Sequence, residues 1–108
     1  GDTAVWTPTS GKKFRVMKYM IAVQGLSTTA AGGVVAITLR DATKAILRTF
    51  NINVPAVALT GAALLYESNW LDLGNGYLSA AANNVLNVNL GTAFTAGGVD
   101  VFVVGTEE

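Results

Sequence analysis

The sequence contains no histidine and no cysteine. Histidine is the commonest general base and metal ligand, and cysteine supplies thiolate nucleophiles, zinc ligands and disulfides. Only Glu67 and Asp72 are internal acids that lie close together in the sequence. A surface pair of this kind usually does no chemistry, although a sugar-cleaving pair of carboxylates would look similar. We therefore expect a protein that is not an enzyme and uses no cofactor and no metal ion.

Charge is also scarce: charged residues make up 13% of the chain, and seven basic side chains balance seven acidic ones. A net charge of zero creates no long-range field, so we expect neither nucleic acid nor a membrane surface as a partner. The sequence has no apolar run of the roughly 18 residues that a membrane-spanning helix needs. A low net charge leaves little repulsion between copies, which suits a protein that works in an assembly.

Apolar residues, by contrast, are abundant, at 51% of the 108 residues. A chain of this length forms one domain, which we expect to span residues 1–108 with residues 1–11 as an N-terminal arm. Such a small domain buries only about two-thirds of the surface of its unfolded chain. Part of the apolar excess must then lie at the surface, where contacts between copies would cover it.

Short runs of β-branched and aromatic residues alternate with glycine, asparagine and aspartate, which is typical of an all-β protein. We predict a two-sheet antiparallel sandwich with a jelly-roll-like topology and about eight strands. The clearest strands are residues 4–7, 12–24, 34–40, 45–54, 85–95 and 99–106. In residues 34–40 the alternation predicts that Val35, Ile37 and Leu39 face the core. Residues 66–73 are expected to be extended, although residues 62–67, preceded by Thr60 as a cap, also fit a short helix.

The apolar alternation of residues 12–24 changes phase midway. One extra residue near Val16 and Met17, a β-bulge, would restore the phase. The side chains expected to face the core are then Phe14, Val16, Met17, Tyr19, Ile21 and Val23, with Lys13, Arg15 and Lys18 outside.

Turns are predicted at residues 41–44, at Gly74-Asn75-Gly76 and at Gly97-Gly98. The last turn would join residues 85–95 to residues 99–106 as a hairpin, with Phe94 opposite Val101 and Thr92 opposite Val103. In that hairpin Phe102 and Val104 lie on the face away from the core, as expected where a second subunit covers a sheet.

The candidate partner-binding residues are therefore Trp6, Lys13, Arg15, Lys18, Phe102 and Val104. Basic residues in the 12–18 segment fit an acidic partner surface, but charges also protect edge strands from unwanted pairing. Two further aromatic side chains, Trp70 and Tyr77, would suit either a sugar-stacking platform or anchors in the core.

Three stretches resemble small structural proteins of tailed bacteriophages. They are Val5-Trp6-Thr7-Pro8 followed by Gly11-Lys12-Lys13-Phe14-Arg15, then Leu78-Ser79-Ala80-Ala81-Ala82-Asn83-Asn84, and finally Gly105-Thr106-Glu107-Glu108. The best-known members of that class are capsid decoration (cement) proteins, which are β-sandwich trimers without catalytic residues. The resemblance implies a location in the virion, with further copies of this chain and the major capsid protein or another virion protein as partners.

Two other functions remain open at this point. One is a carbohydrate-binding module or receptor-binding tail domain that uses Trp70 and Tyr77. The other is a tail or neck connector protein, which differs from a decoration protein only in the surface that it contacts.

Overall fold

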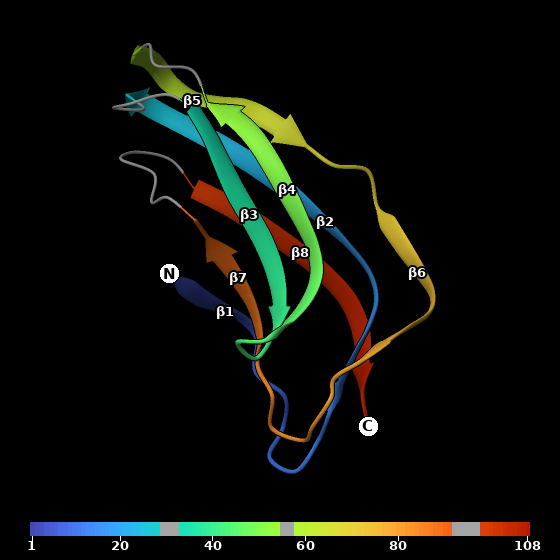
Figure 1. The fold of residues 1–108 in the computed structure, drawn as a ribbon. Coiled ribbons are helices and arrows are strands. Elements are labelled where there is room, and N and C mark those ends of the chain that lie inside the picture. The colour runs from blue at the N-terminus through green and yellow to red at the C-terminus, as the bar shows by residue number, and fades with distance from the viewer. Residues whose placement is uncertain (29–32, 55–57, 92–97) are drawn as a thin grey trace.

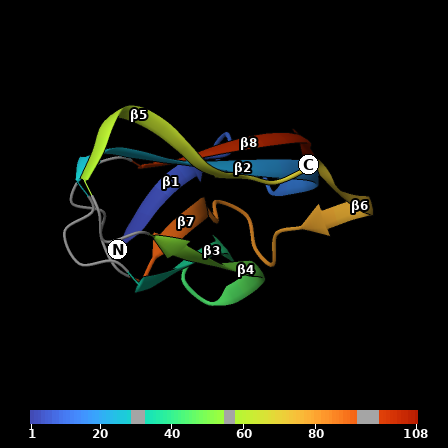
Figure 2. The same ribbon diagram turned by 90° about the horizontal axis from the view of Figure 1, so that it is seen from above.

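The computed structural model describes residues 1–28, 33–54, 58–91 and 98–108, and these residues form two antiparallel β-sheets that pack face to face (Figures 1 and 2). The all-β sandwich expected from the sequence is confirmed. Its strands are β1 (Asp2–Trp6), β2 (Phe14–Thr28), β3 (Gly33–Asp41), β4 (Ala45–Val54), β5 (Ala58–Glu67), β6 (Leu71–Leu78), β7 (Leu86–Leu90) and β8 (Gly98–Glu107).

The first sheet has the strand order β1-β7-β3-β4. In the second sheet, the long strand β2 pairs with β8 on one side and with β5 and β6 in succession on the other. Residues expected as an N-terminal arm are thus part of the sandwich, because Asp2–Trp6 pairs with β7. Residues 62–67 lie within strand β5, so the alternative of a short helix there is wrong.

The predicted β-bulge in β2 is confirmed. Its pairing with both β6 and β8 shifts register between Val16 and Lys18, which leaves Met17 as the extra residue. The strand residues on either side keep the expected alternation, with Phe14, Val16, Tyr19, Ile21 and Val23 buried. Met17 departs from the prediction: it is only half-buried, and its sulfur lies beside Gly76, because a bulged residue is not held in the regular pleat.

The core lies between the sheets. Buried residues of β2 meet Val35, Ile37 and Leu39 of β3, which alternate as predicted, together with Phe50, Leu86 and Val88. The rings of Tyr19 and Phe50 meet edge to face, with centroids 6.4 Å apart. Fully burying a large apolar side chain contributes roughly 1.5–3 kcal/mol, so this layer dominates the stability of the domain.

The predicted hairpin between β7 and β8 is wrong. β7 pairs with β1 and β3 in the first sheet, whereas β8 pairs with β2 in the second, so Val101 lies opposite Ile21 and Val103 opposite Tyr19. Phe94 and Thr92, their predicted partners, lie outside the described residues. Two strands that pair in one sheet and two strands that face each other from opposite sheets both carry apolar residues at every second position. The sequence pattern therefore could not distinguish the two arrangements.

The glycine-rich turns have mixed outcomes. Residues 42–44 connect β3 and β4 in a tight turn, with Ala42 at φ 55°, as predicted. Gly74 and Gly76 do adopt positive φ, 66° and 85°, but they lie inside β6. Between Asp72 opposite Lys18 and Tyr77 opposite Val16, β6 bulges out instead of reversing direction, so the predicted chain reversal is wrong.

Candidate functional site

The outer face of the second sheet carries exposed apolar side chains. On β8, Phe102 and Val104 are 48% and 46% exposed, and they lie opposite Met20 and Lys18 of β2. Trp70, from the connection between β5 and β6, is 47% exposed and lies over the same face, with the Lys18 amine 5.1 Å from its ring centroid. We call Met20, Trp70, Phe102 and Val104 the outer-face patch.

Trp70 is held in place by the residue that begins its loop. The Ser68 backbone amide donates to the Ile21 carbonyl oxygen over 2.9 Å, and the Ile21 amide donates to Ser68 Oγ over 2.8 Å. The buried Ser68 thus takes the place of a strand residue in the gap between β5 and β6. The loop that carries the exposed indole is therefore bonded to the central strand β2 two residues before Trp70.

A shallow groove runs between Trp70 and Phe102. Met20 and Ala22 also line it, and its polar groups are the side chains of Gln24, Glu67 and Asp100. These three polar residues were not among the predicted site residues, since only the folded chain brings β2, β5 and β8 together at this point.

A second hollow lies beside β8. Its volume is about 490 Å³, and it shares Trp70 and Phe102 with the groove; its other lining residues are Val5, Trp6, Val101, Val103 and Gly105. That volume is within the range of small-ligand and peptide pockets, roughly 300–1,000 Å³. Backbone polar groups line the hollow together with these apolar side chains, and none of the side chains is a nucleophile or a base.

Trp6, another predicted partner-binding residue, is half-buried here. Its ring packs on Phe14 with centroids 5.8 Å apart, and its indole nitrogen donates to Glu107 over 3.4 Å. Hydrogen bonds from the side chain and backbone of Thr9, and from Trp6, lower the pKa of Glu107. Trp6 therefore joins β1 to the C-terminal end of β8 and leaves only part of its ring for a partner.

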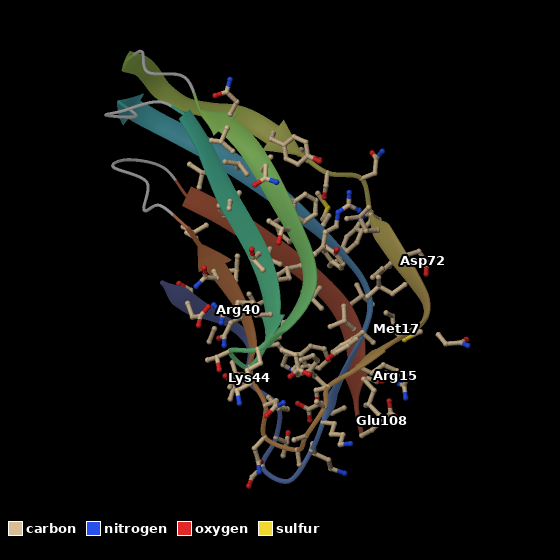
Figure 3. The ribbon with its side chains drawn as sticks, viewed as in Figure 1. Arg15, Met17, Arg40, Lys44, Asp72 and Glu108 are labelled. Atoms are coloured by element: carbon tan, nitrogen blue, oxygen red, sulfur yellow. The ribbon has the colours of Figure 1, made fainter. Side chains whose placement is uncertain are left out.

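The predicted basic side chains do not form one free stripe. Arg15 forms an ion pair with Glu108 and also donates to the Asn75 carbonyl oxygen over 3.1 Å (Figure 3). This hydrogen-bonded pair lowers the pKa of Glu108 and raises that of Arg15. Lys13 is half-buried and exchanges backbone hydrogen bonds with Glu108, whereas Lys18 is exposed beside Trp70. Arg15 thus fastens the end of the chain, and Lys18 belongs to the outer face.

Tyr77 lies on the opposite side of the second sheet from Trp70, so the two rings do not form a common platform. It packs against the core, and its hydroxyl donates to Asp41 Oδ2 over 2.7 Å. Burial and this hydrogen bond raise the pKa of Tyr77 to about 12. Asp41, only 2% exposed, also accepts from the Ala80 amide at 2.7 Å and from Asn84 Nδ2 at 2.8 Å.

Within the residues that the structure describes, no group of acidic side chains could hold a metal ion. Nor does that part of the chain contain a helix long and apolar enough to cross a membrane. Comparisons of the chain with protein-family models, with curated proteins and with solved structures each found no match.

Proposed function

We propose that this chain is a structural protein of a bacteriophage virion, of the capsid decoration type, that associates with further copies of itself. One observation carries the proposal: Trp70, Phe102 and Val104, each about half exposed, gather on one face of a small sandwich. Contiguous apolar surface of this kind usually marks a protein–protein contact. The resemblance of three sequence stretches to phage structural proteins supports the virion as the setting.

In this function the outer-face patch is buried against neighbouring copies, and each Å² of apolar surface removed from water contributes about 25 cal/mol. The assembled oligomer, a trimer if it follows the resemblance, then binds the major capsid protein in the finished shell. Binding to the assembled shell but not to its free subunits stabilises the shell by mass action.

Light scattering and sedimentation at micromolar concentration test the self-association. Phe102→Ser removes the largest apolar side chain of the patch on β8 and should shift the protein toward the monomer. Val34→Ser is the matched control, since Val34 is 64% exposed and lies on the outer side of the first sheet. A native protein that is monomeric under these conditions would contradict the proposal.

Mass spectrometry of purified particles tests the place in the virion. A decoration protein is present in hundreds of copies per shell. A handful of copies would identify a tail or neck connector instead, and no copies would exclude the virion.

The groove beside Trp70 supports a second candidate, binding of a glycan. An exposed aromatic ring can stack on the apolar face of a sugar, and Gln24, Glu67 and Asp100 supply hydrogen-bonding groups beside it. A glycan array tests this function. Trp70→Ala should abolish any binding while Val34→Ser preserves it, and an array without a hit would exclude the candidate.

A further inference from the structure

Strand β8 forms an edge of the second sheet. Among the described residues, β2 is its only strand partner, and the opposite side of β8 borders the hollow lined by Val5 and Trp6. An edge strand exposes the backbone N–H and C=O groups of every second residue. Which residues of β8 expose these groups follows from the hydrogen bonds of β2.

Ile21 supplies the first indication. Both its N–H and its C=O bond to Ser68, on the side of β2 away from β8. In an antiparallel pair the two groups of a residue point to the same side, so Ile21 and Val101 form a pair without hydrogen bonds. The backbone groups of Val101 therefore point to the open edge.

The other end of β8 agrees. Lys13 and Glu108 exchange both backbone hydrogen bonds, at 2.7 and 2.8 Å, so the backbone groups of Glu108 point toward β2. Along β8 the groups of successive residues point alternately toward β2 and away from it. Counting back from Glu108 gives the same alternation as counting from Val101. The residues whose N–H and C=O groups point away from β2 are Val99, Val101, Val103, Gly105 and Glu107. Residues 6–9 lie beside Glu107, because Trp6 and Thr9 donate to its carboxylate, so the open part of the edge ends at Gly105.

This edge lacks the usual protection against pairing. Natural edge strands carry lysine, proline or inward-pointing charges. Here four large apolar residues follow one another from Val101 to Val104, and Asp100 is the only charge between Gly98 and Thr106. The sequence thus favours pairing with another strand.

We infer that the β8 edges of two copies pair antiparallel about a twofold axis at Phe102, which joins their second sheets into one. This inference rests on the self-association proposed above and adds an edge-to-edge contact to it, which places the outer-face patches of two copies side by side in one larger apolar surface. An axis at Phe102 pairs all four residues of the open part of the edge, with Val99 opposite Gly105 and Val101 opposite Val103. An axis at Val101 or Val103 leaves one of them without a partner from the set.

The side chains also match in this register. On the outer face Phe102 meets Phe102 of the second copy, an aromatic cross-strand pair. Asp100 lies opposite Val104, so the two Asp100 carboxylates do not face each other. Self-pairing therefore brings no like charges together and extends the apolar surface of both partners.

The pairing uses twofold symmetry, so it predicts a dimer as the smallest unit in place of the trimer that the resemblance implies.

The cysteine-free chain allows disulfide trapping with single substitutions. Across a pair without hydrogen bonds the Cα atoms are about 4.5 Å apart, within the range of a disulfide. Phe102→Cys should therefore form a disulfide-linked dimer rapidly under mild oxidation. Asp100→Cys alone and Val104→Cys alone should not, because four residues of offset separate the two identical positions by about 13 Å.

A mixture of the Asp100→Cys and Val104→Cys proteins should form a linked heterodimer, and it keeps Phe102 intact. Val34→Cys, on the first sheet, measures linking by random collision. We expect Phe102→Cys and the mixture to form disulfides at least tenfold faster than Val34→Cys does. Linking no faster than this control overturns the twofold pairing. An oligomer seen by light scattering would then leave the proposed self-association standing, whereas a monomer would overturn both.

Discussion

Replacement of Asp41 by alanine should lower the free energy of unfolding by about 3–5 kcal/mol. The carboxylate is 2% exposed and accepts hydrogen bonds from Tyr77, from the Ala80 amide and from Asn84. Each hydrogen bond to a charged group contributes about 1.5–3 kcal/mol, and a buried donor left without a partner carries a similar cost. The donors are only partly buried, so water can reach them after the substitution, which reduces the sum to the stated range.

Asp41→Asn is the matched control. Oδ2 accepts two of the three bonds, those from Tyr77 and Ala80. An amide oxygen in that place keeps both bonds, and the side chain of Asn84 can turn its own oxygen toward the new NH₂ group. The expected loss is therefore smaller, about 1–2 kcal/mol.

Urea unfolding followed by tryptophan fluorescence measures both losses, provided that all variants are compared at one protein concentration, because self-association would add to the apparent stability. A double-mutant cycle with Tyr77→Phe isolates the contact between Asp41 and Tyr77, with an expected coupling of at least about 1 kcal/mol. The reasoning is refuted if the alanine variant loses less than about 1 kcal/mol, or if the alanine and asparagine variants are equally stable.

Three further predictions concern other parts of the fold. The pKa of Tyr77 is raised from 10.0 to about 12, so its contribution to stability is complete below pH 10 and is lost as the pH rises toward 12. In an ultraviolet absorbance titration, one tyrosine should titrate near pH 12. Gly105→Ala should destabilise the protein by about 2 kcal/mol or more in urea, since its Cβ would overlap a β2 carbonyl oxygen, whereas Gly98→Ala meets no atom within 4 Å and should change stability by less than about 1 kcal/mol. The lowered pKa of Glu107 stabilises the folded protein above pH 4.5, and this stabilisation is lost as the pH falls through the pKa of the folded state. The melting temperature of Glu107→Gln should therefore depend less on pH below 4.5 than that of the native protein. An equal pH dependence would contradict the hydrogen bonds from Thr9.

Local patterns in the sequence were sufficient for most strands and most of their buried faces, but not for β5 and β6. The phase change in residues 12–24 revealed the bulge at Met17, and alternation identified the inward side of β3. Both follow from the period of a strand, which is a property of neighbouring residues. The same alternation places Asp41 on the inward side after Leu39, a signal of the buried carboxylate that was interpreted only as part of a turn.

The candidate site was predictable only in part. Phe102 and Val104 are on the outer face as predicted, but Trp70 and Tyr77 turned out to lie on opposite sides of the second sheet. The loop that presents the Trp70 ring depends on Ser68, whose partner Ile21 is 47 residues away in the sequence. No local pattern marks such a residue, because Ser68 bonds to β2 at the point where neither β5 nor β6 pairs with that strand.

What the sequence alone determined is therefore the class of fold, the residues that face the core and the excess of apolar surface. Only the tertiary structure decided which strands pair, and with that the open edge of β8 and the place of the outer-face patch. The physical reason is that alternation specifies which side of a strand is buried, while pairing depends on backbone groups that are chemically alike in every strand. The choice among those partners is made by long-range packing of the two sheets.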